Sequence, residues 1–207
     1  MAWRYKYSVS KYIIASDECG LGSWAGPLVV CAVAVPKDWL GVPGLNDSKK
    51  LSRRRREQVY KELLEVRDLR LSLMKSESID IDRDGIHYCL KRAHTEAIEY
   101  LLADYPDAEI VVDGDLKLKR LPQAKSIPKA DALFPSVMAA SIIAKVNRDW
   151  MMIARARQYP EFGFESHVGY GTKKHQEALK KYGPCPIHRR SYRPIREILQ
   201  LPLFKEK

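Results

Sequence analysis

YIIASDECGLG, residues 12–22, is the stretch that decides the fold of this 207-residue chain. Its first four residues form a short, apolar and partly β-branched run, which predicts a buried strand over 12–15. Asp17 and Glu18 stand where this strand is expected to end, and Gly20-Leu21-Gly22 follows them as a tight turn. Charged groups are costly to bury, so the two carboxylates need water, a cation or hydrogen-bond donors. The stretch therefore predicts the start of a divalent-metal site.

Length and composition limit what surrounds this stretch. A chain of 207 residues, 45% of them hydrophobic, is long enough for one packed domain with at most a small appendage. No apolar run approaches the roughly 20 residues that span a bilayer, so we expect no membrane contact. The opening residues MAWRYK lack the apolar core of a signal peptide, which predicts a cytoplasmic location. The four cysteines lie far apart without zinc spacing, and we expect small buried residues or free thiols in a reducing compartment: Cys19, Cys31, Cys89 and Cys185.

The chain is strongly basic, with a formal net charge of +10 at pH 7. Such a surface favours polyanions such as nucleic acid or anionic lipid, and a solvated basic surface without a partner is the alternative. Aromatic and cationic residues are interleaved with glycines at 167–174 and 187–192, which suits stacking on sugars or bases while phosphates are neutralised. The arginines at 53–56 begin an expected helix against its macrodipole. A polyanion passing nearby would explain them, and a solvated charged face explains them equally well.

The remaining elements are expected to build a sheet around the first strand. The continuous apolar run at 27–35 suits a central strand covered on both faces and paired with the first strand as a hairpin. Alternation at 69–73 predicts a third strand with one wet face. Helices are expected where apolar spacing or a capping residue indicates them: about 52–65, 84–103, 134–158, and a short one that ends near 181.

Two histidines and one aspartate on these helices are given structural interpretations. His87 and His94 lie seven residues apart, near the same face of the expected helix 84–103. No third ligand lies close by, so we interpret them as surface or core histidines rather than metal ligands. Asp149, deep in the expected helix 134–158, is a candidate partner for a basic side chain.

Further carboxylates are expected to join the first pair. The run EIVVDG at 109–114 repeats the opening pattern, a β-branched strand that ends in a carboxylate and a glycine. Sites in open α/β sheets form at the carboxyl ends of strands, which places Asp113 beside Asp17. A turn-forming Asp-Gly is the alternative for Asp113. Asp131, just before the long helix, can project into the same site, although helix entry alone would also explain it.

These four carboxylates at the ends of elements, in a basic protein, are what a two-metal phosphodiesterase requires. Hard oxygen ligands suit Mg²⁺ or Mn²⁺. Two such ions about 4 Å apart can generate an attacking hydroxide and stabilise a leaving oxygen. Basic surroundings offset the repulsion between carboxylates and a phosphate. No Walker loop, dinucleotide fingerprint or Ser-His-Asp spacing competes with this interpretation.

With these motifs in place, the chain resembles the ribonuclease HII family over nearly its whole length. Five blocks carry the resemblance in the same order: SDECGLGSWAGPLVV (16–30), LNDSKKLS (45–52), VVDG (111–114), KADALFPSVMAASIIAKVNRD (129–149) and FGFESHVGYGTKKHQEALKKYGPCPIHRRSY (162–192). The resemblance implies a ribonuclease H-like α/β fold with a mixed five-stranded sheet flanked by helices. It also implies a catalytic domain over 1–160 and a small C-terminal helical substrate-binding extension over 161–207, which form one structural unit.

The resemblance implies an activity as well. Members cut RNA endonucleolytically within RNA–DNA hybrids, including single ribonucleotides embedded in duplex DNA. Their products carry 3′-hydroxyl and 5′-phosphate ends, as expected if metal-bound water attacks. The implied cofactors are two Mn²⁺ or Mg²⁺ ions, and the implied partners are hybrid duplexes and ribonucleotide-containing DNA. We expect a monomer, because no unspent apolar helix face is evident.

The functional residues of the family fall on this sequence one by one. The metal-binding, catalytic acids match Asp17, Glu18, Asp113 and Asp131. The remaining matches concern substrate: the glycine-rich reader of the 2′-hydroxyl on Gly20, Leu21 and Gly22, phosphate contacts on Asn46, Ser48 and Lys49 with Lys50 beside them, and the tyrosine that stacks on the sugar at the RNA–DNA junction on Tyr170.

Leu21 departs from the family, which usually has arginine or lysine between the two glycines. Leucine keeps the backbone groups that can read a 2′-hydroxyl but loses a side-chain contact to phosphate. Cys19 and Trp24 also replace commoner small or apolar residues. We therefore expect a metal-dependent nuclease with weakened recognition of the junction. Two alternatives stay open: another nuclease or strand-transfer enzyme of the same fold, and a non-catalytic hybrid-binding protein, which predicts a missing acid whereas all four are present.

Overall fold

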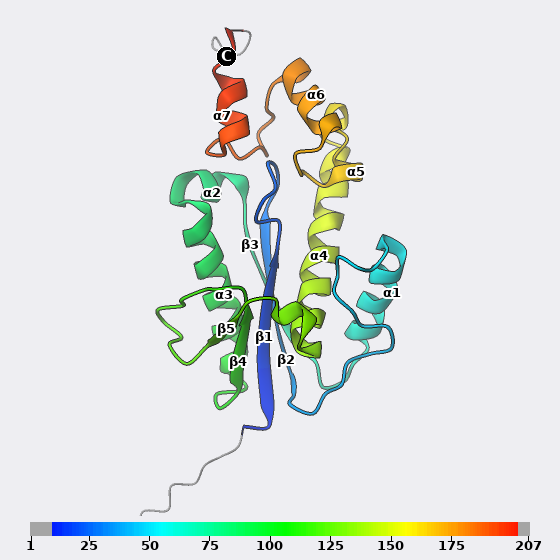
Figure 1. Cartoon of the computed structure of the whole chain (residues 1–207), viewed down its shortest axis with the longest axis vertical. Coiled ribbons are helices and arrows are strands. Elements are labelled where there is room, and N and C mark those ends of the chain that lie inside the picture. The colour runs from blue at the N-terminus through cyan, green and yellow to red at the C-terminus, as the bar shows by residue number, and fades with distance from the viewer. Residues whose placement is uncertain (1–9, 203–207) are drawn as a thin grey trace, which may run out of the picture.

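Strand β1 (Tyr12–Cys19) lies inside a mixed five-stranded sheet in the computed structural model, which describes residues 10–202 (Figure 1). β2 pairs antiparallel with β1 as a hairpin and with β3, while β4 pairs parallel with β1 and with β5. The predicted mixed sheet of five strands is therefore confirmed. The strand order is β3-β2-β1-β4-β5, with β2 at Leu28–Pro36, β3 at Arg70–Ser76, β4 at Glu109–Asp113 and β5 at Lys125–Ile127.

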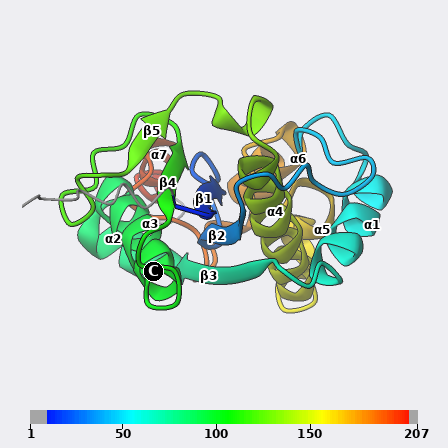
Figure 2. The same ribbon diagram turned by 90° about the horizontal axis from the view of Figure 1, so that it is seen from below.

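Helices cover both faces of this sheet (Figure 2). Helix α4 (Pro135–Ala156) packs on one face with α1 (Arg53–Leu64) beside it, and α3 (Ile86–Leu102) packs on the other. Successive strand residues point to opposite faces, so Val33 of β2 faces α4 and Ala32 faces α3. Because both faces are buried, β2 reads as one continuous apolar run.

β1 continues past its predicted end at residue 15, because its pairing with β2 runs on to Cys19 opposite Val29. Asp17 and Glu18 therefore lie inside a paired strand instead of following it. Their side chains project to opposite faces of the sheet. The two carboxylates therefore cannot both point to the same side of β1.

The predicted helices are confirmed near their expected ends, and Ser52 caps α1 by accepting a hydrogen bond from the Arg55 N–H at 3.3 Å. Sequence reasoning missed α2, whose capping box of Glu77 and Asp80 was the available signal. The bounds of the elements not yet given are α2 at Ser78–Asp84, α5 at Phe164–His167, α6 at Lys173–Tyr182, α7 at Arg193–Leu199, and short 3₁₀ helices at Ala130–Ala132 and Pro160–Phe162.

The C-terminal helices close around an apolar cluster of their own, which includes Phe162 and Phe164. Ala25 from the β1–β2 connection and Met152 from α4 belong to the same cluster, so this part packs on the sheet domain. The division at residue 160 stays a prediction, and the outer ends of both predicted ranges, like MAWRYK, lie outside residues 10–202. All four cysteines are buried and unpaired, as predicted. Across residues 10–202, no helix combines the length and the apolar character needed to cross a membrane.

Candidate active site

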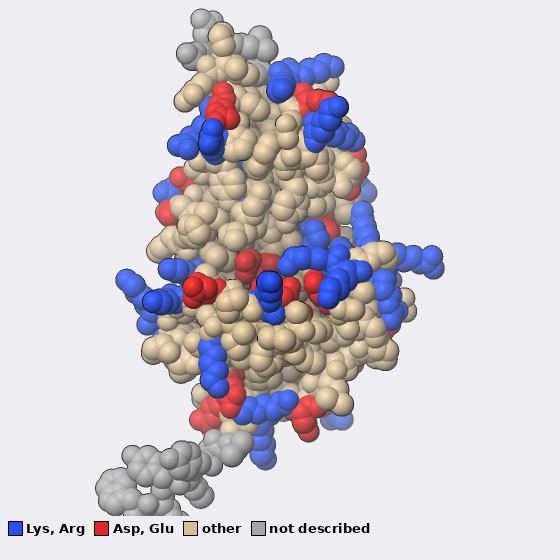
Figure 3. All heavy atoms as spheres, in the orientation of Figure 1, with Lys and Arg blue, Asp and Glu red and all other residues tan. Residues whose placement is uncertain are grey.

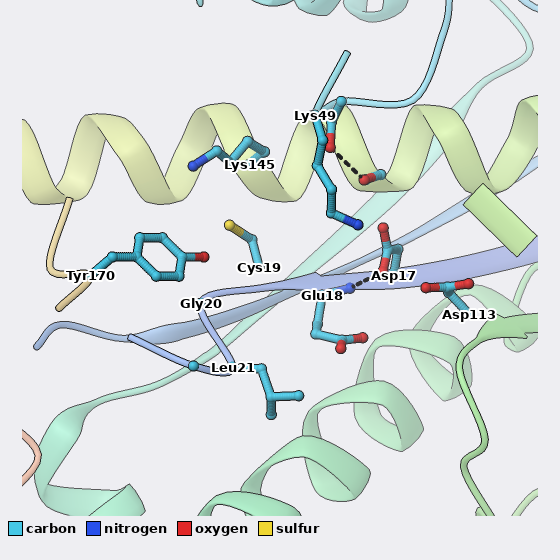
Figure 4. Close-up of a pocket in the computed structure, with 12 residues that line it drawn as sticks. Asp17, Glu18, Cys19, Gly20, Leu21, Lys49, Asp113, Lys145 and Tyr170 are labelled. Carbon is cyan, nitrogen blue, oxygen red and sulfur yellow. Dashed lines mark hydrogen bonds between the residues drawn. The ribbon is translucent and has the colours of Figure 1, made fainter. Parts of the chain in front are cut away.

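A pocket of about 440 Å³ opens beside the carboxyl end of β1 (Figure 4). Asn46 does not line it; this side chain is exposed, and its Oδ1 accepts a hydrogen bond from the Asp47 N–H at 2.8 Å. The pocket brings together most of the predicted site residues, which come from distant parts of the chain: Asp17, Glu18, Gly20, Leu21, Gly22, Ser48, Lys49, Asp113 and Tyr170.

Three carboxylates form the centre of the site. Asp17, Asp113 and Asp131 each place one oxygen so that the three atoms lie within 4.8 Å of one another. The parallel register pairs Ser16 with Val112, which sets Asp17 beside Asp113. Asp131 sits on the 3₁₀ helix Ala130–Ala132, whose Ala130 N–H donates to Asp113 Oδ1 at 2.6 Å. The parallel pairing of β1 with β4 and the 3₁₀ turn at Ala130–Ala132 thus bring Asp17, Asp113 and Asp131 together, as predicted.

Glu18 stands apart from this group of three. It follows Asp17 in a paired strand, so its side chain leaves the opposite face. Its Oε2 lies 3.2 Å from His94 Nε2 on α3, whereas Asp17 accepts the Glu18 N–H at 2.7 Å. Figure 4 shows the Glu18 carboxylate turned away from Asp17 toward the α3 side. Three of the four predicted acids thus converge from one side of β1, and Glu18 lines the same pocket from the other side.

The Gly20–Gly22 turn is held by the C-terminal part of the chain. Gly20 has φ +98°, and a Cβ there would lie 2.1 Å from Arg148 Nε, so only glycine fits. The Leu21 carbonyl accepts hydrogen bonds from Arg189 Nη1 at 3.0 Å and from the Tyr192 hydroxyl at 2.6 Å. A Cβ on Gly22 would meet no atom within 4 Å. This second glycine therefore leaves open space that a ligand can approach.

Tyr170 closes the pocket on the side of the C-terminal helices. The Lys145 ammonium and the Arg148 guanidinium lie 5.6 and 5.5 Å from the centroid of its ring. His175 donates from Nδ1 to the Tyr170 carbonyl at 2.9 Å, which fixes the backbone at this position. The tyrosine ring is thus presented to the pocket from a rigid support.

Ser48 and Lys49 reach the pocket from the loop before α1. Ser48 is buried with its Oγ 2.9 Å from Ser141 Oγ, and Lys49 Nζ lies 3.3 Å from Asp131 Oδ2. Arg56 supports this loop by donating to the Ser48 carbonyl at 2.9 Å and pairing with Asp149 at 3.5 Å. The predicted role of Asp149 as a partner for basic side chains is confirmed.

Comparison with known proteins identifies the chain. A family model described as Ribonuclease HII matches residues 14–195. The chain belongs to the ribonuclease HII family. Ribonuclease HII of Bacillus cytotoxicus is 42% identical over 91% of this chain and 71% of its own length, and that of Dichelobacter nodosus is 39% identical over 91% and 97%. The protein is therefore a ribonuclease H that cuts RNA in RNA–DNA hybrids, in a family that depends on divalent metal.

Solved structures confirm the ribonuclease H-like fold. Ribonuclease HII of Archaeoglobus fulgidus, solved in its complex with PCNA, is 30% identical with a TM-score of 0.74, covering 89% of this chain and 96% of that one. Ribonuclease H2 of Pyrococcus horikoshii is 26% identical with a TM-score of 0.65, covering 95% and 100%. Bst-RNase HIII, solved with Mn²⁺, has a TM-score of 0.71 over 96% and 71%; at 21% identity, it shows the shared fold alone.

Electrostatics of this ribonuclease HII favour a cation at the three carboxylates. Burial, together with the charges of Glu18 and Asp113, raises the pKa of Asp17 to about 8. Burial and the nearby Asp131 also raise the pKa of Asp113. Partial burial lowers the pKa of Lys49, but the charge and hydrogen bond of Asp131, together with the charges of Asp17 and Asp47, outweigh it, so the pKa is raised. Three hard oxygen donors that repel one another fit Mg²⁺ or Mn²⁺, whose charge would stabilise their ionised forms.

Sequence reasoning missed His94 in the site of this ribonuclease HII. It interpreted this residue as a surface or core histidine without a role, and the side chain is indeed buried. The structure adds that His94 links two residues of β1, Ser16 and Glu18. No pattern in the sequence marks which residue of α3 faces this part of β1.

Proposed function

We propose that this enzyme hydrolyses RNA in RNA–DNA hybrids and also cuts at single ribonucleotides embedded in duplex DNA, leaving 3′-hydroxyl and 5′-phosphate ends. The observation that carries the proposal is that one pocket is lined both by the carboxylates of Asp17, Glu18 and Asp113, with Asp131 beside them, and by a Gly-x-Gly backbone turn. The carboxylates suit phosphodiester hydrolysis, and the turn suits recognition of a ribose. A nuclease that does not distinguish ribose from deoxyribose needs only the carboxylates.

The carboxylates are proposed to hold two Mg²⁺ or Mn²⁺ ions. Asp17, Asp113 and Asp131 converge within 4.8 Å, and Glu18 approaches from the other face of β1. Two such ions, when bound, would supply a hydroxide nucleophile and neutralise charge on the leaving 3′ oxygen. Attack by water instead of the 2′-hydroxyl leaves the 5′-phosphate and 3′-hydroxyl ends. Lys49, exposed at the rim, is placed to neutralise the phosphate as it enters.

The Gly20–Gly22 turn is proposed to read the 2′-hydroxyl through backbone groups. The Leu21 carbonyl is already taken by Arg189 and Tyr192. Among the described residues, the N–H groups of Leu21 and Gly22 make no hydrogen bond. These two donors can therefore serve a ribose hydroxyl, and the open space at Gly22 allows the sugar to approach. Tyr170 is proposed to stack on the sugar at the junction.

The surface around the pocket supports a nucleic-acid duplex as substrate. Figure 3 shows Asp and Glu atoms in the middle of this face with Lys and Arg side chains on both sides. Basic groups offset the repulsion between the acidic centre and the phosphates of a duplex. We further propose that Ser48 and Lys49 contact backbone phosphate. Asn46, exposed on the same loop, joins them only if the loop closes on the duplex.

We propose that the enzyme works as a monomer in the cytoplasm. The pocket is complete within one chain, since all of its lining residues come from the range 17–170. Four buried, unpaired cysteines suit a reducing compartment.

The test compares three duplexes of one sequence: an RNA–DNA hybrid, a DNA duplex with one ribonucleotide, and an all-DNA duplex. With Mg²⁺ or Mn²⁺ we expect cutting of the first two only, and no cutting in EDTA. The products should be extended by a polymerase and joined by a ligase without further treatment. Cutting of the all-DNA duplex would favour a general nuclease of this fold, and no cutting under any metal would favour a hybrid-binding protein.

Leu21→Arg tests the ribose-reading half on its own. Leu21 is 37% exposed at the pocket, so an arginine there can reach a phosphate without displacing the core. One exposed ion pair is worth up to about 1 kcal/mol, or about a fivefold lower KM on the single-ribonucleotide duplex. If the wild type already prefers the single-ribonucleotide duplex as strongly as Leu21→Arg does, the leucine does not weaken recognition of the junction.

A further inference from the structure

His94 occupies a fully buried position between α3 and β1, at 0% exposure. Its Nε2 lies 3.2 Å from Glu18 Oε2, and its Nδ1 lies 2.7 Å from Ser16 Oγ. Ser16 and Glu18 share one face of β1 because they are two residues apart. One imidazole therefore spans the two side chains on the α3 side of the strand.

The direction of these hydrogen bonds is set by the donor inventory. An ionised carboxylate only accepts, so His94 Nε2 carries the proton and donates to Glu18. In the neutral ring Nδ1 accepts from the Ser16 hydroxyl. In the charged ring Nδ1 donates to Ser16 instead, and Ser16 donates to the Cys31 carbonyl at 3.1 Å. The donation to Glu18 is the same in both states, so the contact does not depend on the charge of the ring.

Glu18 depends on this contact for its orientation. Among the described residues, His94 provides the one hydrogen bond to the Glu18 carboxylate, and it uses Oε2. Oε1 is left free to accept from, or bind, a group in the pocket. Without His94 the side chain of Glu18 could rotate away from the three converging carboxylates.

We propose that His94, oriented by Ser16, is a positioning residue that fixes Glu18 for metal binding at the catalytic centre. The proposal deepens the proposed function and rests on it for the identity of the metal. Partners of this kind raise metal affinity by fixing a ligand before the metal arrives, and their loss typically weakens binding 10–100-fold.

The experiment compares His94→Leu with His94→Gln. Leucine fills similar space without a donor, and Ser16 can then donate to the Cys31 carbonyl, so no buried hydroxyl is orphaned. Glutamine keeps an N–H donor on a side chain of similar reach. Mn²⁺ affinity is measured by titration calorimetry without nucleic acid, with Tm in EDTA as the control for folding.

We expect Mn²⁺ binding about 10–100-fold weaker in His94→Leu and within about threefold of wild type in His94→Gln. A double-mutant cycle with Glu18→Gln sharpens the test, since His94→Leu should have no further effect once Glu18 cannot act. Unchanged affinity in His94→Leu, equal losses in both variants, or an additive cycle would each overturn the proposal. Calorimetry uses no substrate, so failure of the enzyme to cut hybrids would leave this result standing by itself.

A second pocket, of about 490 Å³, lies between α3 and the loop after β4, outside the catalytic pocket. Its rim is basic: Lys91, Lys117 and Lys119 are exposed, and none of them pairs with an acid in the part of the chain that the structure describes, whereas two arginines there do. Tyr88 is 58% exposed beside them. Unpaired cations next to an exposed aromatic ring suit a nucleic-acid backbone.

The second pocket lies next to the part of α3 that contacts the catalytic centre. Thr95, which lines it, follows His94, the residue that touches Glu18 of the catalytic centre. Basic side chains flank the acidic centre on both sides of the face in Figure 3. We propose that this second pocket binds backbone phosphates of the same duplex, away from the bond that is cut. This inference also rests on the proposed function, which supplies the duplex.

The test pairs Lys117→Gln/Lys119→Gln with a control, Lys11→Gln/Arg67→Gln. The control removes the same charge from exposed residues before β1 and β3, at the opposite end of the sheet. Binding to a 30-base-pair hybrid and a matching DNA duplex is followed by fluorescence anisotropy in EDTA over a range of salt. Each lost phosphate contact should lower the slope of log K against log salt by about 0.9.

We expect the slope to fall by about 1–2 in the Lys117/Lys119 variant on both duplexes, because two phosphate contacts are lost. The control should leave the slope as it is. An unchanged slope, or an equal fall in the control, would overturn the proposal. Since phosphates are common to both duplexes, the slope reports on the pocket even if the enzyme shows no preference for ribonucleotides.

Discussion

Replacing Asp17 by asparagine should stabilise the metal-free enzyme, and the gain should grow with pH. The pKa of Asp17 is raised from 3.8 to about 8, first by burial and then by the charges of Glu18 and Asp113. A carboxyl group of this kind binds its proton more tightly in the folded than in the unfolded chain. The free energy of unfolding therefore falls as pH rises between the two pKa values. Asparagine has no such proton to lose.

The magnitude is set by the width of the pH window. Between about pH 5 and pH 7.5 the unfolded chain has lost the Asp17 proton while the folded protein keeps most of it. One proton of difference changes stability by about 1.4 kcal/mol per pH unit, or about 3 kcal/mol over this interval. Other groups titrate in both proteins and largely cancel. Asp17→Asn should thus gain about 3 kcal/mol on the wild type between the two pH values, whatever their difference at pH 5.

Urea denaturation in EDTA, followed by far-ultraviolet circular dichroism at both pH values, measures this gain. Asp68→Asn, at an exposed position, is the matched control and should show none of it. Adding Mn²⁺ at 100 times its Kd should stabilise the wild type by about 2.7 kcal/mol and the variant by much less. A difference between Asp17→Asn and wild type that is the same at pH 5 and pH 7.5 would refute the reasoning.

Three other outcomes are expected from the same geometry. The Mn²⁺ affinity of the wild type should rise up to about tenfold per pH unit between pH 5 and 7.5, because binding displaces the Asp17 proton. Calorimetry in buffers of different ionisation heat counts the released proton. An affinity that does not change with pH would contradict the prediction. Gly20→Ala should lower Tm by several degrees, because the φ of Gly20 is +98° and Arg148 occupies the space that a Cβ would need. Gly22→Ala should have a Tm close to that of the wild type. A larger loss of Tm in Gly22→Ala than in Gly20→Ala would contradict this description of the turn. Arg148→Met should lower the free energy of unfolding, measured with urea, by about 3 kcal/mol or more, because three backbone carbonyls lose their donor. A loss below about 1 kcal/mol would contradict this role of Arg148.

The convergence of the acids was predictable because it results from strand pairing. Two β-branched runs that each end in a carboxylate become neighbours once they pair in parallel, and the register then sets Asp17 beside Asp113. Asp131 arrives by a different route, through a 3₁₀ turn that begins after Lys129 in the left-handed region at φ 60°. That turn is fixed by the Ala130 N–H bound to Asp113, a tertiary contact with no local signal.

Charged residues were the hardest to interpret from sequence. Arg148 and Arg189 look like surface cations, yet both are fully buried and donate to backbone carbonyls of the β1–β2 connection. A passing polyanion and a solvated charged face explained the arginines at 53–56 equally well, but Arg55 and Arg56 instead donate to carbonyls of the loop before α1. An irregular segment leaves carbonyls unpaired, and only the folded arrangement shows which guanidinium reaches them.

The two halves of the site differ in how far the protein alone completes them. Without a cation, the ionised forms of the carboxylates are unfavourable, because burial and mutual repulsion raise the pKa values of Asp17 and Asp113. In the Gly20–Gly22 turn, by contrast, Arg189 and Tyr192 already donate to the Leu21 carbonyl, and these hydrogen bonds do not depend on the metal. Removing the metal should therefore abolish cleavage without disordering the turn that is proposed to read the ribose. The proposed recognition of a ribonucleotide and its hydrolysis therefore depend on different parts of the molecule. The first depends on the β1–β2 connection, which Arg189 and Tyr192 hold, and the second depends on the carboxylates at the sheet.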